Sequence, residues 1–323
     1  MITRMKKWFI ESYFSTAQYQ QKGDLKMNSK SIFATATITN KSENQDSKGQ
    51  ISTNLLNAVL VADGLGSYKY ARQASDSVVG SLLKTLGSIK DNSRLDFEKL
   101  FKTAKDELIK LSDKTKTDEE KKGTDSLFGT TLLTIVETKH TVKIAYVGNG
   151  AIWHIRGNFA DNFHKTFIEG HQPISITWNV VNLLNPHSIP ENGKEALLRL
   201  ISECPTDYAE CVPTVIEIKK DSQEGDIFMI CSDGIYSADK PTIFPSKSGK
   251  IFIRYEETMQ KFFEHLKLFF EKNSEYTNEN LSTAINLYLQ EVKPDLDDDA
   301  TLGVLITEKA LNYQKSKKTN NCK

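Results

Sequence analysis

Three aspartates far apart in this chain share one local context that suits the binding of divalent cations. Asp63 and Asp233 each end an apolar run and precede a glycine, whereas Asp298 comes just before the apolar run 302–306. If the third strand runs antiparallel to the other two, all three carboxylates meet at one edge of a sheet. Hard divalent cations prefer carboxylate oxygens presented in this way, with water in the open positions. The pattern therefore predicts a metal centre at strand ends.

Each of these aspartates also has a simpler explanation when it is considered alone. Asp63-Gly64 and Asp233-Gly234 are typical of turns at strand ends, and the run Asp297-Asp298-Asp299 is typical of a solvated acidic loop. The metal hypothesis depends on the shared context, because two carboxylates follow apolar runs and the third precedes one.

The composition is that of an ordinary globular protein. The chain has 323 residues, of which 42 are basic and 42 acidic, so bulk charge gives no reason to expect a nucleic-acid or membrane-surface partner. No apolar stretch is long enough to span a bilayer. The 4 cysteines lack the paired spacing of a disulfide framework or a zinc site, which is typical of a reducing cytoplasm. We therefore expect a cytoplasmic protein, and a monomer.

The chain divides into one long domain and two flanks. Residues 1–30 form an N-terminal extension without the continuous apolar core of a signal peptide. Residues 31–308 form the domain, in which prolines concentrate between about 170 and 213 and predict an irregular, flap-like insertion over one edge. Residues 309–323 form a polar, lysine-rich tail that we expect to be disordered.

Apolar periodicity predicts pairs of helices placed between runs of strands. Helical spacing predicts helices at 71–82, 97–111, 255–272 and 277–291. Apolar or alternating runs predict strands at 31–38, 55–62, 130–136, 142–146, 152–156, 214–219, 227–231 and 301–306. Gly148-Asn149-Gly150 predicts a β-hairpin between two of them. Because helices do not alternate one-for-one with strands, we predict an α+β fold with two packed antiparallel sheets and helices on their outer faces.

Six short motifs stand at the predicted strand ends. They are Asn44-Gln45-Asp46, Val61-Ala62-Asp63-Gly64-Leu65-Gly66, Phe128-Gly129-Thr130-Thr131-Leu132, Tyr146-Val147-Gly148-Asn149-Gly150, Cys231-Ser232-Asp233-Gly234-Ile235 and Asp298-Asp299-Ala300-Thr301. Each motif alone is weak, but together, over roughly residues 40–306, they resemble in kind and order those of the metal-dependent serine/threonine protein phosphatases of the 2C class, in its bacterial type.

The resemblance implies a four-layer α-β-β-α sandwich and a site with two Mn²⁺ or Mg²⁺ ions. It implies that Asp63 bridges the two metals and that Gly64 supplies a backbone carbonyl. Asp233 and Asp298 then each bind one metal, and Asp46 holds a metal-bound water. Lys41 stands where the family usually has an arginine that grips the substrate phosphate; a lysine keeps the charge but loses the bidentate geometry.

Three positions depart from the family's usual pattern. Asn149 stands where an aspartate usually helps to hold a third metal, and a neutral amide is a poor ligand for Mg²⁺ or Mn²⁺, so the third site is in doubt. Leu65 replaces a histidine that some members use as a general acid, and Gln45 stands where a glutamate is common.

The leading hypothesis is a phosphatase that hydrolyses phosphoserine or phosphothreonine in proteins through a metal-activated water, opposite a serine/threonine kinase. One alternative is a regulatory binding module that keeps the fold but has little catalysis. Asn149 and Lys41 favour it, whereas the intact set of Asp63, Asp233 and Asp298 argues against it. Another alternative is a hydrolase of a small phosphorylated metabolite, which a deep cleft closed by the insertion would favour.

Overall fold

The computed structural model describes residues 30–91, 95–166, 174–177, 180–191, 194–204, 208–235, 242–245, 251–254 and 257–321. Two five-stranded sheets form its centre, and every neighbouring pair of strands in them is antiparallel. The first sheet has the order β1 (Ile32–Ile38), β18 (Ala300–Ile306), β15 (Asp226–Cys231), β7 (Ala151–Arg156) and β10 (Val180–Asn182). The second has the order β14 (Thr214–Lys219), β6 (Thr141–Val147), β5 (Leu132–Glu137), β3 (Asn57–Asp63) and β2 (Asp46–Ser52).

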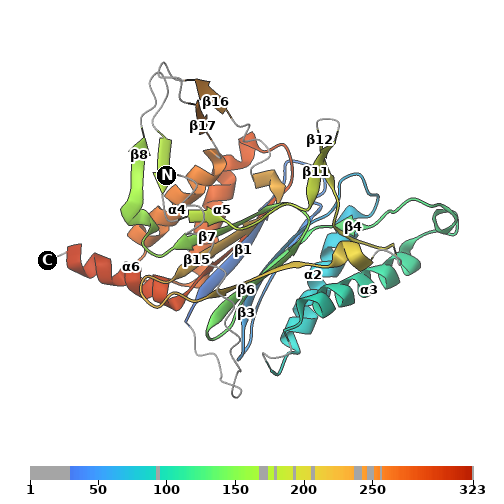
Figure 1. The fold of residues 1–323 in the computed structure, drawn as a ribbon, viewed down its shortest axis with the longest axis horizontal. Coiled ribbons are helices and arrows are strands. Elements are labelled where there is room, and N and C mark those ends of the chain that lie inside the picture. Colours follow the sequence, from blue (N-terminus) through green and yellow to red (C-terminus); the bar gives the residue numbers. More distant parts are fainter. Residues whose placement is uncertain are drawn as a thin grey trace.

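Three separate hydrophobic clusters fill the spaces between four layers. The central cluster joins the inner faces of the two sheets, with Phe33, Phe228 and Leu305 from the first and Val59 and Ile135 from the second. The two outer clusters join each sheet to a pair of helices. Figure 1 shows α2 (Ala71–Gly87) and α3 (Phe97–Thr115) on one side, and α4 (Glu257–Lys272) and α5 (Asn278–Val292) on the other. The predicted α+β, α-β-β-α sandwich is confirmed.

Helices α3 and α5 begin at capping residues, and each buries one apolar face. The side chain of Asp96 accepts a hydrogen bond from the Lys99 amide at the start of α3, and Thr277 caps α5 through the Asn280 amide. Along α3 the buried Leu100, Ala104 and Leu108 recur at helical spacing. All four predicted helices are therefore present, although α2 and α3 extend further than their apolar periodicity indicated.

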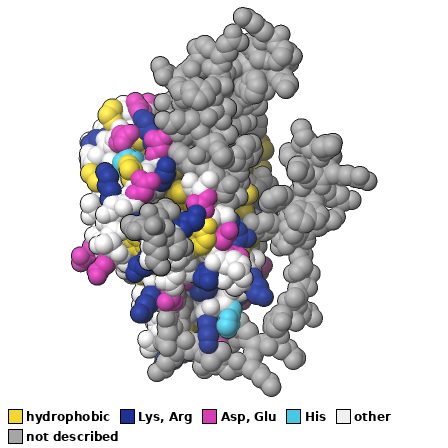
Figure 2. All heavy atoms as spheres, turned by 90° about the vertical axis from the view of Figure 1, so that its left-hand side faces the viewer, with side chains coloured by type: hydrophobic (Ala, Val, Ile, Leu, Met, Phe, Trp, Pro, Cys, Tyr) yellow, Lys and Arg dark blue, Asp and Glu magenta, His cyan; other side chains and the backbone are white. Residues whose placement is uncertain are grey.

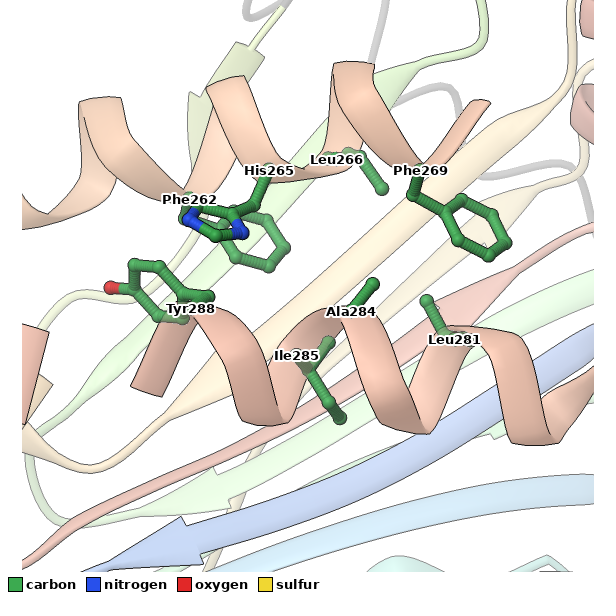
Figure 3. Close-up of a pocket in the computed structure, with 8 residues that line it drawn as sticks. All are labelled: Phe262, His265, Leu266, Phe269, Leu281, Ala284, Ile285 and Tyr288. Atoms are coloured by element: carbon green, nitrogen blue, oxygen red, sulfur yellow. The ribbon is translucent and has the colours of Figure 1, made fainter. Parts of the chain in front are cut away.

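Helices α4 and α5 leave a small apolar gap between them. Figure 3 shows the side chains of the two helices facing one another across it. The gap measures about 10 Å³, which is the size of a single water and too small for a ligand. We therefore regard it as a packing defect within the outer cluster. Its lining residues are Phe262, His265, Leu266, Phe269, Leu281, Ala284, Ile285 and Tyr288.

The predicted hairpin at Gly148-Asn149-Gly150 is wrong. The strands on either side of this turn, β6 and β7, lie in different sheets and do not pair. The turn instead carries the chain across the end of the sandwich, with φ of 103° at Gly148 and 124° at Gly150. Glycine adopts these positive values without the steric cost that a side chain would add. The prediction that the three carboxylates meet at one edge of a single sheet is also wrong, because Asp63 ends a strand of one sheet and Asp233 follows a strand of the other.

The disorder expected for the C-terminal tail is also wrong, because residues Glu308–Asn321 form α6. Ala310 and Leu311 are buried, and the Gln314 amide donates to the carbonyl of Gly157. The Tyr313 hydroxyl donates to Asp161 at 2.9 Å. A few well-placed contacts thus order a helix that is mostly polar. The predicted N-terminal extension lies outside the described residues up to position 29.

Between β7 and β14, where the prolines predict an irregular, flap-like insertion, the described residues include short strands. Strand β13 (Ile201–Ser202) pairs with β4 (Gly129–Thr130), and β11 (Ser188–Glu191) pairs with β12 (Lys194–Leu197). Figure 1 shows the β11–β12 pair projecting at the top of the molecule. The remaining small pairs are β8 (Phe163–Thr166) with β9 (Ile174–Thr177), and β16 (Thr242–Pro245) with β17 (Ile251–Arg254). The 3₁₀ turns are Glu120–Lys122, Phe159–Asn162, Tyr208–Cys211, Asp233–Ile235 (η5) and Lys293–Asp295.

Charged side chains of both signs are mixed on the surface. Figure 2 shows lysine and arginine side chains interspersed with aspartate and glutamate on the described part of one face. Within the described ranges, no helix combines the length and apolarity that a membrane span requires.

Candidate metal centre

The centre of the site is a pair of aspartates on neighbouring strands. Asp46 begins β2 and Asp63 ends β3, and the two residues face each other in the antiparallel ladder. The Asp46 side chain is fully buried, and that of Asp63 is partly exposed. Burial raises the pKa of Asp46 to about 7, although hydrogen bonds to Thr301 and Ser232 oppose the shift. Desolvation, followed by the charges of Asp46 and Asp233, raises the pKa of Asp63 well above its usual range.

Residues of the other sheet complete the carboxylate group. The Ser232 hydroxyl donates to Asp46 Oδ2 at 2.8 Å and accepts from the Thr301 amide at 3.0 Å. Asp233 follows at the start of η5, close enough to Asp63 to raise its pKa by charge and by hydrogen bonding. Asn149 reaches Asp233 from the crossover turn, with Nδ2 donating to Oδ2 at 2.9 Å. The amide is therefore a partner of the Asp233 carboxylate.

Two threonines fix the backbone of Asp63. The Thr131 hydroxyl accepts from the Asp63 amide at 3.0 Å, and the Thr131 amide donates to the Asp63 carbonyl at 2.8 Å. The Thr130 hydroxyl donates to the same carbonyl at 2.8 Å. Gly64, the predicted carbonyl ligand, lies next in the chain and bridges to Thr130. The segment 129–131 therefore sets where the Asp63 carboxylate can point.

Asp298, the remaining predicted ligand, pairs with a lysine. It is exposed and forms an ion pair with Lys41 Nζ. Burial lowers the pKa of Lys41, but the hydrogen bond and charge of Asp298 outweigh this effect and raise it. The structure thus brings Asp46, Asp63 and Asp233 together, and joins Asp298 to the lysine predicted to grip phosphate.

Asp299 is a site residue to which the sequence reasoning gave no role. Its side chain is buried, accepts from the Gln45 amide at 2.7 Å and also accepts from the Thr39 hydroxyl. It therefore ties the start of β18 to the connection that leads into Asp46. Ser232 and Thr131 were missed in the same way, because their partners are distant in sequence and only the motifs that contain them gave a signal.

The donor set consists of the carboxylate oxygens that a hard divalent cation prefers. Asp46 Oδ1 is buried without a hydrogen-bond partner among the described residues. The neighbouring Asp63 carboxylate could donate a hydrogen bond to this atom only if it were protonated. A cation or a cation-bound water would satisfy the same atom. Among the described residues, no three histidine, cysteine, aspartate or glutamate side chains are spaced as a complete ligand set. The carboxylates fit a metal by chemistry, and Asp298 is paired with Lys41 in this structure.

A scan against protein-family models matches the description "Protein phosphatase 2C" over residues 34–286. The chain belongs to the protein phosphatase 2C family. Its class is accordingly that of the phosphatase hydrolases, and the family generally uses Mn²⁺ or Mg²⁺. The match covers Asp46, Asp63 and Asp233 and ends before Asp298.

Solved structures of bacterial phosphatases share the fold. A bacterial serine phosphatase superposes with a TM-score of 0.55 at 17% identity, covering 87% of this chain and 98% of its own. Serine/threonine phosphatase Stp1 from Staphylococcus aureus gives 0.52 at 15% identity, with 90% and 98% covered. The S. agalactiae serine/threonine phosphatase gives 0.52 at 15% identity, with 84% and 98% covered. No curated protein sequence matches the chain significantly.

Proposed function

We propose that this member of the family hydrolyses phosphoserine and phosphothreonine in proteins and uses two Mn²⁺ or Mg²⁺ ions. The observation that supports this most is the orphaned Oδ1 of Asp46 beside Asp63 and Asp233. Clustering carboxylates in a desolvated place costs free energy, which a bound cation offsets. We further propose that the protein acts in the cytoplasm, opposite a serine/threonine kinase.

Asp63, the Gly64 carbonyl, Asp233 and Asp298 would hold the metals, and Asp46 would hold a water through its free oxygen. Bound divalent cations lower the pKa of water and neutralise charge on a phosphoryl group. Lys41, once it leaves Asp298, can place its ammonium on the substrate phosphate as a point charge. Leu65 cannot donate a proton, and we propose that water protonates the leaving oxygen.

Asn149 limits this proposal to two metals. Its side-chain amide donates to Asp233 and adds no negative charge, so Asp233 already has a neutral partner on this side. A third cation would have to displace this hydrogen bond and bind an amide oxygen in its place. We propose that the third position is lost in this chain.

A regulatory binding module is the second candidate. Two contacts favour it, since Lys41 pairs with Asp298 and Asn149 pairs with Asp233 within the chain itself. Such pairs could hold the fold without any catalytic role. Substrate turnover separates the two candidates, because a binding module would retain a phosphopeptide without releasing phosphate.

A comparison of substrates tests the proposed class. Phosphate release would be measured in Mn²⁺ for a phosphothreonine peptide, a phosphoserine peptide and a set of small sugar phosphates. We expect release from the peptides with kcat/KM well above that for the sugar phosphates. Preference for a sugar phosphate would support the metabolite hydrolase instead, and binding of peptides without release would support the binding module.

A further inference from the structure

Between β10 and β14 the chain has a stretch whose described residues, 183–191 and 194–203, contact the segments that carry the candidate carboxylates. The Leu183 amide donates to the Ile152 carbonyl at 2.7 Å, just past the crossover turn. Asn185 then bonds to Tyr146, whose hydroxyl donates to the Asn185 carbonyl and accepts from its amide. These contacts join the stretch to the strands on both sides of Asn149.

Glu203 ends this stretch with a buried carboxylate that binds two successive backbone amides. Its oxygens accept from the Leu127 amide at 2.7 Å and from the Phe128 amide at 2.9 Å. Lys116 lies 2.7 Å from the same carboxylate and balances its charge. Charge-assisted hydrogen bonds of this kind are stronger than neutral ones, so residues 127 and 128 are held firmly.

The segment that Glu203 holds leads directly to Asp63. Gly129 accepts a hydrogen bond from the Leu65 amide at 3.0 Å, and Thr130 and Thr131 bind the backbone of Asp63 as described above. Strand β13, just before Glu203, also pairs with Gly129 and Thr130. Residues 127–131 are thus fixed by Glu203 at one end and by Asp63 at the other.

His187 holds the other side of the site in a similar way. Its backbone amide donates to the Gly148 carbonyl at 3.0 Å, and its Nδ1 accepts from the Gly148 amide at 3.3 Å. Because a backbone amide can only donate, Nε2 carries the proton and donates to the Thr214 hydroxyl at 2.8 Å. The ring also stacks on Tyr146, with centroids 5.0 Å apart. Gly148 precedes Asn149, the partner of Asp233.

We propose that Glu203 and His187 are positioning residues that set the metal-binding geometry from outside it. Glu203 acts on Asp63 through residues 127–131, and His187 acts on Asp233 through Gly148 and Asn149. The inference rests on the proposed function, because it assumes that Asp63 and Asp233 bind the metals. It assigns these two residues roles that do not require contact with the substrate.

Glu137 provides a matched control for Glu203. It is also a buried glutamate, and it accepts from Ser31 at 2.7 Å, Asn57 at 2.9 Å and Lys220 at 2.8 Å. It faces Asn57 at the start of β3, whereas Asp63 ends that strand. Replacing either glutamate removes hydrogen bonds to a buried carboxylate, and Glu203 is the one whose partners lead to Asp63 through residues 127–131.

The test is calorimetric titration of Mn²⁺ into Glu203→Ala, Glu203→Gln, Glu137→Ala and the wild type, with hydrogen exchange of residues 127–131 measured alongside. We expect Glu203→Ala to weaken Mn²⁺ binding about 10-fold and to speed exchange of this segment. Glu203→Gln, which keeps an acceptor, should lie between Glu203→Ala and wild type. Glu137→Ala should lower the melting temperature but leave Mn²⁺ affinity within about twofold of wild type. Equal Mn²⁺ affinities in Glu203→Ala and Glu137→Ala would overturn the proposal for Glu203. If Glu203→Ala does not fold, the Mn²⁺ affinities of Glu203→Gln and Glu137→Gln are compared instead, and equal values would overturn it.

His187 is tested by a pair of substitutions. His187→Asn can keep an acceptor near Nδ1 for the Gly148 amide, whereas His187→Ala removes it. We expect His187→Ala to weaken Mn²⁺ binding about 10-fold and His187→Asn to restore most of the loss. Equal affinities in the two variants would overturn its role. A wild type that binds Mn²⁺ but releases no phosphate would overturn the proposed function alone, since these affinities do not depend on turnover.

Discussion

Asp46 faces Asp63 across the β2–β3 ladder, and its Oδ2 accepts a hydrogen bond from the Ser232 hydroxyl of the opposite sheet. One buried carboxylate therefore connects the two sheets at the end where the candidate metal ligands lie. The Oδ1 of Asp46 has no hydrogen-bond partner among the described residues. This arrangement lowers the stability of the metal-free protein and prepares the site for a cation.

Replacing Asp63 with asparagine should abolish turnover and stabilise the metal-free protein. The change removes one charge from a desolvated carboxylate group but also one metal ligand, so we expect activity to fall by about 100-fold or more. Asp233→Asn should likewise abolish turnover and stabilise the metal-free protein. Activity assays in Mn²⁺ and thermal melts in EDTA would measure the two effects.

Asp226→Asn is the matched control, because Asp226 is buried at the opposite end of β15 with His154 at 2.8 Å and Arg156 at 2.6 Å. Weakening this paired carboxylate should destabilise the protein by up to about 3 kcal/mol. Melting temperatures in EDTA should therefore shift in opposite directions for the two variants. Near-native turnover of Asp63→Asn with normal metal dependence would show that the site is wrongly assigned.

The metal-free protein should lose stability as pH rises towards 7. The folded state holds a proton on Asp46 up to a pKa of about 7, whereas the unfolded chain releases it near the ordinary value of 3.8. Between these values the folded state binds more protons, so this contribution to stability is full below the lower value and is lost as pH rises. The slope is on the order of 1 kcal/mol per pH unit at most.

Urea denaturation in EDTA between pH 5 and pH 8 would measure this slope, with Asp46→Asn as the reference. The difference between wild type and variant isolates the contribution of Asp46. In Mn²⁺ the trend should reverse, because metal binding requires the deprotonated carboxylates. Parallel pH profiles for the two proteins in EDTA would contradict the assignment of the raised pKa to this site.

Lys41→Ala should raise KM more than it lowers kcat, because a flexible ammonium acts mainly as a point charge on the phosphate. Lys41→Arg should be tolerated or improved, since a guanidinium can bind phosphate through two donors. Steady-state kinetics on a phosphopeptide would measure both. Lys48→Ala, which changes a lysine of β2, serves as the control, and unchanged kinetics in Lys41→Ala would mean that another cation grips the phosphate.

Asn149→Asp should destabilise the metal-free protein and restore a third metal position. The aspartate would replace a 2.9 Å hydrogen bond to Asp233 with repulsion between like charges, at a cost of about 1–3 kcal/mol without metal. Calorimetry with Mn²⁺ should show one more weak site than in the wild type, together with faster turnover at high metal concentration. Asn149→Ala removes the same donor without adding charge, and equal stoichiometry in all three proteins would show that position 149 has no metal-binding role.

The sequence predicted the helices and the apolar strands well because both have a clear periodicity. It missed β2, since Asp46–Ser52 is mostly polar and is held by its ladder with β3 and by α2, against which Gly49 approaches Val79 and Leu83. The turn at Gly148-Asn149-Gly150 has the same local chemistry in a hairpin and in a crossover between sheets. Only the pairing of distant strands distinguishes the two.

The same limit applies to the site. Asp46, Asp63 and Asp233 stand out by their context in short motifs, and the structure brings them together. The ion pair of Lys41 with Asp298 and the hydrogen bonds of Asp299 connect residues more than 250 positions apart, so no local pattern could indicate them. Glu203 lies in a stretch without any motif, and its partners become visible only when the chain has folded.

The most direct test of the central claim is phosphate release from a phosphothreonine peptide by the purified chain, measured in Mn²⁺ and again after exhaustive chelation with EDTA. Our account predicts release in Mn²⁺, loss of release in EDTA, and recovery when Mn²⁺ or Mg²⁺ is restored. Release that survives chelation, or its absence at saturating metal from protein that binds Mn²⁺, would contradict the account.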